Sequence, residues 1–524
     1  MRNDCFAMRA IRRFINMALR ADVKRTNCYT VKAKLMVQKK NLTRRTFIGQ
    51  TAATGVGLTV VPSFVLGGQG RTAPSDKINV ALIGSGTQAL KQLPDWLKRE
   101  ELQFVSVCDP NRASYDYPQW GRSQGEKKGA AGGREIGRAR IGQYYATKSN
   151  SASYKGCSAY ADFRELLETE KGLDAVFIMT PDHLHATVAL AAMKKKLSVA
   201  THKPIANFMQ ETRLACTRAR ETGVATHCFA FQDPPELYTL QSWISAGVIG
   251  KVKELHRWTN RPMWPQGSPY LPAGQPVPEG FDWQLWLGPS TDRPYSPDYT
   301  HTVFRGWYEF GAGCLADMGY YGFWKDWRIL NLGMPVTAEG SSSFTCEIKD
   351  YRSTWVKNKL SYPHAATLYW KVPAGAGKEF ADVFWYEGGI RPATPAPLTA
   401  NGRRMPKEGV MFVGEHGAIV ADYGYENPVL LGVKDAEALT ASVRPPQPEL
   451  VDQTTEMIQA FQGQKPSRGS FEQVQTVAEA ICLGNLAIRM DDRLEWDNQS
   501  MKVTNLPEAN NFLSRIYRPG WELS

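Results

Sequence analysis

Residues 78–89 read INVALIGSGTQA, an apolar run that leads directly into two glycines separated by one residue. The apolar run predicts a buried strand of a parallel sheet. Gly84 and Gly86 permit a tight turn in which the backbone approaches a pyrophosphate at the next helix N-terminus, and Ala89 is small enough for close helix–strand packing. Asp109 ends the following apolar run, where its carboxylate can accept hydrogen bonds from a ribose diol. Strand, turn and acid together predict a dinucleotide-binding unit.

The predicted ligand is a nicotinamide dinucleotide. We expect NAD in preference to NADP because the Asp109 carboxylate repels a 2′-phosphate, while Arg112, three residues further on, leaves NADP open. Ligands of such sheets bind beyond the carboxyl ends of the strands, so the segments that follow the apolar runs 175–179 and 197–200 belong to the same site. The expected cofactor-binding residues are Gly84, Gly86, Thr87, Gln88, Asp109, Thr180, Pro181, His185 and Lys203.

The chain after this unit alternates apolar runs with helical patterns. Residues 162–167 and 186–196 predict helices, and three lysines at the end of the second suit a helix C-terminus. Residues 121–142, rich in Gly, Lys and Arg, predict a solvated insertion. The expected fold class is α/β, with an N-terminal Rossmann domain built on a doubly wound parallel sheet.

Most of the net positive charge lies in the N-terminal leader, residues 1–75. Residues 1–48 contain 13 Lys and Arg against two Asp, so in a chain of net charge +12 the remainder is close to neutral. Nucleic-acid binding requires a cationic surface on the folded part of a protein, so we expect no nucleic-acid partner. Residues 43–48, TRRTFI, match a twin-arginine export signal, and the mildly apolar stretch 49–66 is a poor membrane span. We therefore expect the twin-arginine export machinery as a partner and a periplasmic or otherwise exported location.

Cysteine and histidine usage gives no sign of a disulfide framework or a metal centre. Seven of the nine cysteines lie outside the leader, scattered and odd in number. His183 and His185 stand two residues apart near a predicted helix start, but no third ligand is indicated by spacing. No metal is expected.

Three further motifs follow the glycine turn in a fixed order. They are TPDHLH at 180–185, a Lys-Pro at 203–204 and GAGCLADMGYYG at 311–322. In this order they resemble the Gfo/Idh/MocA oxidoreductase family, over nearly all of the chain after the leader. The resemblance implies a Rossmann domain over residues 76–205 and a C-terminal α/β domain over residues 206–524, with a large open sheet that carries the substrate wall and often the oligomer interface. A homo-oligomer is expected on the same ground.

Two positions depart from the family pattern. His202 replaces the acid of the usual Glu-Lys-Pro, and Tyr321 stands in the histidine place of the Asp-x-Gly-x-His segment. A tyrosine there is similar to glucose–fructose oxidoreductase and dihydrodiol dehydrogenases, where it serves as acid/base. The resemblance therefore implies Lys203, Tyr321 and Asp317 as catalytic residues.

The chemistry of these side chains agrees with that implication. Removal of a hydride from a carbinol carbon requires a base for the hydroxyl proton. A lysine beside an oxidised nicotinamide ring lies near a fixed positive charge, which together with desolvation favours the neutral amine; the same field is expected to lower the pKa of Tyr321. Either Lys203 or Tyr321 can accept the proton while the other orients the oxygen. For Asp317 two roles stay open: a structural one, in which it fixes the turn or pairs with Lys203, and a direct part in the chemistry.

Aromatic residues indicate a carbohydrate ligand. Seven of the fifteen tryptophans lie between residues 258 and 327, and flat aromatic faces stack on the apolar faces of pyranose rings, although aromatic residues also fill cores and interfaces. The expected substrate contacts are His202, Trp258, Arg261 and Trp264.

The predicted function is that of an exported NAD(P)-dependent oxidoreductase acting on a secondary alcohol of a saccharide or polyol. The same fold also supports an NAD-retaining glycosidase or lyase that works through transient oxidation of the sugar. A non-catalytic nucleotide-binding protein is a third possibility, which the departures at positions 202 and 321 leave open.

Overall fold

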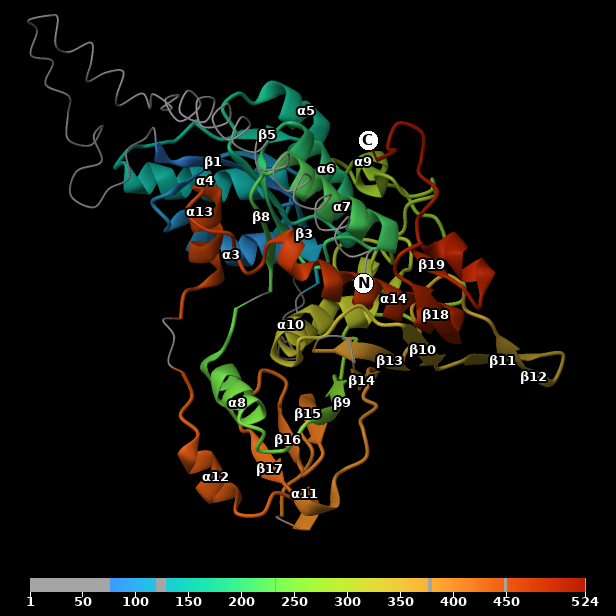
Figure 1. Cartoon of the computed structure of the whole chain (residues 1–524). Helices are drawn as coiled ribbons and strands as arrows, with labels where there is room; N and C mark the ends of the chain where they lie inside the picture. The colour runs from blue at the N-terminus through green and yellow to red at the C-terminus, as the bar shows by residue number, and fades with distance from the viewer. Residues whose placement is uncertain are drawn as a thin grey trace, which may run out of the picture. The chain divides into compact units, whose positions relative to one another are not determined.

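The glycine turn follows a central strand of a six-stranded sheet in which all neighbouring strands are parallel (Figure 1). The strand order is β5-β2-β1-β6-β7-β8, which is the 3-2-1-4-5-6 order of dinucleotide-binding Rossmann domains. The strands are β1 (Ile78–Ile83), β2 (Leu102–Cys108), β5 (Ser158–Tyr160), β6 (Ala175–Ile178), β7 (Ser198–His202) and β8 (Thr226–Phe229). The predicted fold class is confirmed for this part of the chain.

The computed structural model describes residues 76–118, 129–230, 232–375, 379–400, 402–446 and 450–523. The leader with its twin-arginine motif lies outside the described residues. Within the ranges given, no helix combines the length and the apolar character needed to cross a membrane.

The helices that follow the strands of the parallel sheet are α3 (Thr87–Leu97), α4 (Arg134–Lys148), α5 (Phe163–Thr169), α6 (His185–Lys194) and α7 (Met209–Thr222). A short hairpin of β3 (Ser114–Tyr117) and β4 (Ala130–Gly132) precedes α4. The prediction of a solvated insertion over 121–142 is therefore wrong from residue 129 onward. The physical reason is that α4 buries Ile141 and Tyr145 in the same core as the parallel strands.

The sixth strand shifts the expected domain boundary. β8 pairs in parallel with β7, and Phe229 packs against Trp96 and Phe177 with ring centroids 5.3 and 5.9 Å apart. The Rossmann sheet therefore continues through residue 229. A domain boundary after residue 205 falls too early, because it would separate β8 from the aromatic core on which Phe229 packs.

The C-terminal part contains a nine-stranded sheet in the order β17-β16-β15-β9-β14-β13-β10-β18-β19. Only β9 and β14 are parallel neighbours among these strands; the other described pairs are antiparallel. The strands are β9 (Val252–Trp258), β10 (Thr337–Ser342), β13 (Ala366–Ala374), β14 (Glu379–Tyr386), β15 (Gly409–Gly414), β16 (Ala418–Asp422), β17 (Val429–Leu431), β18 (Arg493–Asp497) and β19 (Lys502–Val503). This confirms the large sheet that was expected.

Two long helices, α10 (Gly313–Leu330) and α14 (Phe471–Met490), pack on one face of the nine-stranded sheet. Phe323 of α10 lies edge-on to Trp370 of β13, with ring centroids 5.2 Å apart. A side chain at Gly484 of α14 would collide with Leu368 and Trp370, so this glycine allows the helix to lie close to the strands. α10 is thereby fixed between the sheet and the Rossmann domain, and it carries Asp317.

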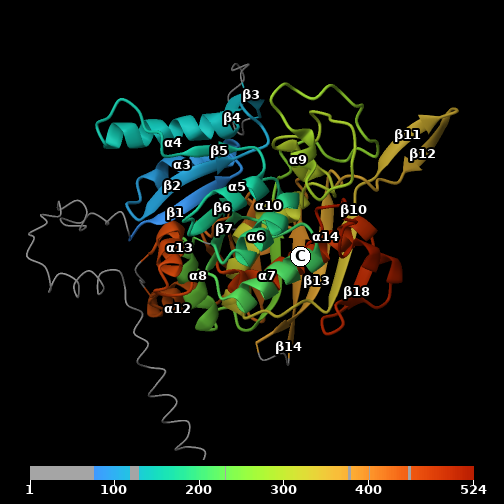
Figure 2. The same ribbon diagram turned by 90° about the horizontal axis from the view of Figure 1, so that it is seen from above.

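The remaining elements lie at the margins of these layers. The hairpin of β11 (Thr345–Lys349) and β12 (Arg352–Val356) projects from the sheet (Figure 2). The others are α8 (Pro235–Ser245), α9 (Trp283–Leu287), α11 (Ala396–Ala400), α12 (Ala436–Ser442), α13 (Gln453–Phe461) and the 3₁₀ helices Asp182–Leu184, Val303–Gly306 and Pro507–Phe512.

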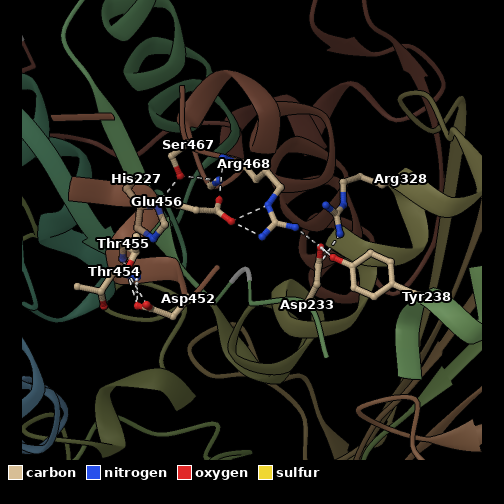
Figure 3. Close-up of polar contacts among 11 residues, drawn as sticks. His227, Asp233, Tyr238, Arg328, Asp452, Thr454, Thr455, Glu456, Ser467 and Arg468 are labelled. Atoms are coloured by element: carbon tan, nitrogen blue, oxygen red, sulfur yellow. Dashed lines mark hydrogen bonds and ion pairs between the residues drawn. The ribbon is translucent and has the colours of Figure 1, made fainter. Parts of the chain in front are cut away.

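A polar network next to β8 joins segments that are far apart in sequence (Figure 3). His227 of β8 contacts the Ser467 hydroxyl through Nδ1 at 2.7 Å. The buried carboxylate of Asp233 accepts hydrogen bonds from Arg328 of α10 and from Arg468, each at 2.6 Å. Two cations on one carboxylate hold the segment after the Rossmann sheet against α10, and so fix that helix relative to the glycine turn.

Candidate active site

A cleft with an empty volume of about 810 Å³ lies beyond the carboxyl ends of β1, β6 and β7. The 281–305 segment supplies its other wall. All of the predicted cofactor-binding residues line this cleft: Gly84, Gly86, Thr87, Gln88, Asp109, Thr180, Pro181, His185 and Lys203. The structure therefore brings them together at the place where a parallel sheet binds its ligand.

The two glycines have different roles. Gly84 has a φ of +92°, and a Cβ there would lie 2.4 Å from the backbone of Met179, so this glycine allows the ends of β1 and β6 to approach. Gly86 caps α3 without any side-chain acceptor for the first amides of the helix. Uncapped amides and the positive end of the helix dipole fit the pyrophosphate of a dinucleotide.

Asp109 fixes the glycine turn from the end of β2. Its two carboxylate oxygens accept hydrogen bonds from the backbone amides of Ser85 at 2.7 Å and Asn111 at 2.8 Å. Burial raises the pKa of this carboxyl above 3.8, and the two amides oppose that rise. Each oxygen retains a second lone pair, so Asp109 can still accept a ribose hydroxyl.

His185 holds the loops that follow β6 and β7. Its Nδ1 lies 2.6 Å from the carbonyl oxygen of Pro204 and its Nε2 lies 2.9 Å from that of Thr180. Burial lowers the pKa of this imidazole below 6.5, so the neutral ring donates to only one of the two carbonyls, and its place between them makes His185 a residue that shapes the cleft. His183 likewise contacts two backbone carbonyls, and the described part of the chain contains no group of His, Cys, Asp and Glu arranged for a metal ion.

An ion cluster lies at the wall of the cleft: Lys203 and Arg305 line the cleft, and Asp317, which pairs with both, does not. The buried Lys203 ammonium donates to Asp317 Oδ1, and Arg305 Nε donates to the same oxygen at 3.0 Å. Burial by itself raises the pKa of Asp317, but Lys203 and Arg305 outweigh that effect and lower it to about 2. Asp317 is therefore a permanent carboxylate that anchors two cations, which agrees with the predicted pairing and makes it a poor proton acceptor.

Tyr321 lies next to this cluster but not among the residues that line the cleft. Lys203 Nζ stands over its ring, 5.2 Å from the centroid. Burial raises the pKa of Tyr321 above 10.0, more than the Lys203 charge lowers it. Desolvation of the phenol thus exceeds the attraction of a cation that Asp317 already neutralises, while the lowering expected beside an oxidised nicotinamide ring stays a prediction.

His202 lines the cleft immediately before Lys203. Burial, followed by the charges of Lys203 and Arg305, holds the pKa of its imidazole well below 6.5. A neutral imidazole at this point can accept or donate one hydrogen bond to a ligand.

The other three predicted substrate contacts lie outside the cleft lining. Trp258 is fully buried in the core of the large sheet and donates to the carbonyl of Pro406 at 3.0 Å. Trp264 is buried in the main core, and Arg261 contacts the Met263 sulfur. The prediction of sugar stacking by Trp258 and Trp264 is wrong for this structure, because these rings fill the core.

Several cleft residues carry no motif in the sequence. They are Tyr117, Phe281, Trp286, His301, Phe304 and Arg305. Tyr117 and His301 lie ring to ring with centroids 3.7 Å apart, and the Tyr117 ring stands 3.3 Å from where a Gly86 Cβ would lie. The abundance of aromatic residues between 258 and 327 predicted an aromatic wall, but it did not indicate which of these residues line the cleft.

Known proteins resemble this chain in its Rossmann part and in its C-terminal part. Residues 138–229 match the profile "Oxidoreductase family, NAD-binding Rossmann fold", and residues 247–327 match "Oxidoreductase family, C-terminal alpha/beta domain", both of the Gfo/Idh/MocA family. A glycosyl hydrolase family 109 protein of Stenotrophomonas maltophilia is 28% identical over 156 residues, which are 30% of this chain and 28% of that protein. The scyllo-inositol 2-dehydrogenase (NAD(+)) of Bacillus subtilis is 32% identical over 88 residues, which are 17% of this chain and 25% of that protein.

The chain thus matches little more than a quarter of the length of either of these curated relatives. Among solved structures, the WlbA dehydrogenase from Chromobacterium violaceum in complex with NADH and UDP-GlcNAcA superposes with a TM-score of 0.49 and 12% identity, covering 82% of this chain and 98% of that one. The Rossmann and C-terminal profiles match in their order along the sequence, so the chain resembles the Gfo/Idh/MocA oxidoreductases over these two segments and carries an NAD-binding Rossmann domain.

Proposed function

We propose that the protein is an exported, NAD-dependent oxidoreductase that acts on a secondary alcohol of a saccharide or polyol. The observation that supports this most directly is the Lys203–Asp317–Arg305 cluster, which lies in the same cleft as the uncapped N-terminus of α3. A proton-transfer group beside a dinucleotide site is what alcohol oxidation requires.

Each residue of the cluster has a separate task. When bound, the nicotinamide ring supplies the hydride acceptor. Lys203 is the proposed acid/base at the substrate hydroxyl: it takes the hydroxyl proton during oxidation and returns a proton to the carbonyl oxygen in the reverse direction. Asp317 and Arg305 fix the position of Lys203, and neutral His202 accepts a hydrogen bond from a neighbouring hydroxyl of a polyol.

The polyol class and the preference for NAD rest on different grounds. One relative is named as an NAD(+)-dependent inositol dehydrogenase, which acts on a cyclic polyol. Asp109 at the end of β2 disfavours a 2′-phosphate by charge repulsion. Two nearby cations leave NADP open: exposed Arg112, and Arg134, whose guanidinium donates to the carbonyls of Asp109 and Pro110.

A second candidate is a glycosidase or lyase that retains NAD and oxidises the sugar transiently. The relative named as a glycosyl hydrolase family 109 protein favours it. Release of a reducing sugar without net change in absorbance at 340 nm identifies this activity, whereas net dehydrogenation accumulates NADH. A protein that binds NAD but turns over no sugar or polyol in either assay is a non-catalytic binder.

Export and oligomerisation belong to the same proposal. The TRRTFI motif at 43–48 supports transfer by the twin-arginine machinery to the periplasm, which moves proteins that have already folded around their cofactors. The large sheet with one covered face supports a homo-oligomer that buries the other face. Sedimentation analysis of the purified protein tests the second point.

The catalytic assignment is tested by Lys203→Ala and Tyr321→Phe, measured on the sugar or polyol that proves active. Lys203→Ala should retain NAD binding and lose roughly 10²–10⁴-fold in kcat, the usual contribution of a positioned acid or base. Tyr321→Phe retains the ring beneath Lys203 and should lose less than Lys203→Ala, because the hydroxyl does not line the cleft.

Lys195→Ala is the matched control, since this lysine forms an exposed pair with Glu168 and neither residue lines the cleft. A loss in Tyr321→Phe that equals or exceeds the loss in Lys203→Ala would assign the acid/base role to the tyrosine. Unchanged kcat in both variants would contradict the proposed site.

A further inference from the structure

A second cavity, with an empty volume of about 360 Å³, adjoins the segment that follows Lys203. It is lined by residues of the start of α7, the last turns of α14 and the 3₁₀ helix 507–512, together with Tyr308 and Tyr362. Asn485 at its wall donates to the carbonyl of Ala312, whose amide donates to Asp182 of the cofactor cleft. The cavity is therefore a neighbour of the cleft and shares no lining residue with it.

Buried polar atoms face this cavity without protein partners. The side chain of Asn207 is 8% exposed, yet neither its amide nitrogen nor its oxygen has a hydrogen-bond partner in the described structure. Asn485 uses its nitrogen on Ala312, and its oxygen has no partner. Buried amides left unpaired are costly, so their presence around one cavity points to a ligand that completes them.

The single charged group of the lining is Arg489. Its guanidinium lies between two rings, 4.6 Å from the centroid of Tyr308 and 3.9 Å from that of Phe512. Within the described residues no hydrogen bond or ion pair is recorded for it. Stacking on both faces holds the guanidinium plane in place and leaves its N–H edges free for an acceptor.

The start of α7 adds to this positive field. Phe208 at the N-cap offers no side-chain acceptor to the first amides, and Phe208 and Met209 both line the cavity. Glu211 in the first turn does not line it; its Oε1 accepts hydrogen bonds from Arg515 and Tyr517. The cavity therefore combines a helix N-terminus, an uncompensated guanidinium and an unpaired amide donor, which suits an anion.

We propose that this cavity is a binding site for a small oxyanion, either free phosphate or the carboxylate of a small organic acid. Arg489 provides the opposite charge and Asn207 donates a hydrogen bond, whereas the amide of Gln210 in the first turn of α7 already donates to the carbonyl of Leu513. Tyr308 and Tyr362 line the same cavity. The 360 Å³ includes space open to solvent, so the cavity suits only a small anion and excludes a second dinucleotide. This proposal is independent of the reaction catalysed in the cleft.

The test is isothermal titration of the purified full chain, saturated with NAD so that the pyrophosphate site is filled, with inorganic phosphate and separately with acetate. The expected result is saturable binding of at least one of the two anions. Binding of phosphate alone identifies phosphate as the ligand group, and binding of acetate identifies a carboxylate. Absence of saturable binding for both would overturn the proposal and show that solvent fills the cavity.

Two variants tie the binding to the cavity. Arg489→Gln should weaken it by roughly tenfold or more, because a charge-assisted hydrogen bond is lost. Asn207→Asp keeps the shape of the side chain and adds a negative charge to the cavity, so this variant should not bind the anion. It also keeps the test valid if Arg489→Gln fails to fold, because we expect Asn207→Asp to fold. Arg493→Gln, at an exposed arginine of β18, is the matched control and should bind as the wild type does. Unchanged affinity in both cavity variants would overturn the assignment.

Discussion

Replacement of Asp317 by Asn removes the anion that holds Lys203 and Arg305 in the cleft. The pKa of Asp317 falls from 3.8 to about 2 in the folded protein, chiefly because the attraction of the two cations exceeds the cost of burial. Each pKa unit corresponds to 1.36 kcal/mol, so the ionised carboxylate contributes about 2.5 kcal/mol to the free energy of unfolding at neutral pH. Asp317→Asn should lose about this amount at pH 7, together with most of its turnover, since Lys203 is no longer anchored.

The stabilisation by Asp317 should depend on pH, and the direction of this dependence follows from the lowered pKa. A carboxyl whose pKa is lower in the folded state stabilises the protein above pH 4, and this contribution is lost as the pH falls from about 4 to about 2. The difference between wild type and Asp317→Asn in urea denaturation should therefore be full at pH 7 and smaller at pH 3. Asp95→Asn, which breaks an exposed pair with Lys98, is the control and should change stability by less than about 1 kcal/mol. A difference that is absent at pH 7, or equal at pH 7 and pH 3, would refute the reasoning.

Three further predictions concern the cofactor, the core and export. Gly86→Val should abolish NAD binding in calorimetry without unfolding the protein, because the added carbons collide with the Tyr117 ring and close the turn; retained binding would contradict the site. Trp258→Phe should lower the free energy of unfolding by about 1–3 kcal/mol, because it removes a hydrogen bond and leaves a small cavity. The KM for the sugar should not change, and a raised KM would show that this ring contacts the substrate. Replacement of Arg44 and Arg45 by Lys should retain the protein in the cytoplasm when cell fractions are compared by immunoblot, and normal periplasmic delivery would disprove the twin-arginine assignment.

The sequence by itself determined the Rossmann part of this protein. Residues 78–89 carry a strand, a turn and a helix start within twelve positions, and each depends on local backbone conformation and on side-chain size. Gly84 has the positive φ that the turn requires, and Gly86 caps α3 as the pattern predicted. The cofactor-binding residues follow from the same logic, because the carboxyl ends of parallel strands meet at one edge of a sheet.

Only the tertiary structure decided which side chains act together in the cleft. Lys203 and Asp317 are 114 residues apart, and their ion pair exists because α10 is held between the two sheets. Arg305 carries no motif and is recognisable only by its hydrogen bond to Asp317. Trp258 and Trp264 were expected at the substrate site but lie in the core. Packing against a sugar and packing in a core both stabilise an aromatic ring, so the sequence position does not distinguish the two roles. Burial, which depends on every neighbouring element at once, is what separates them.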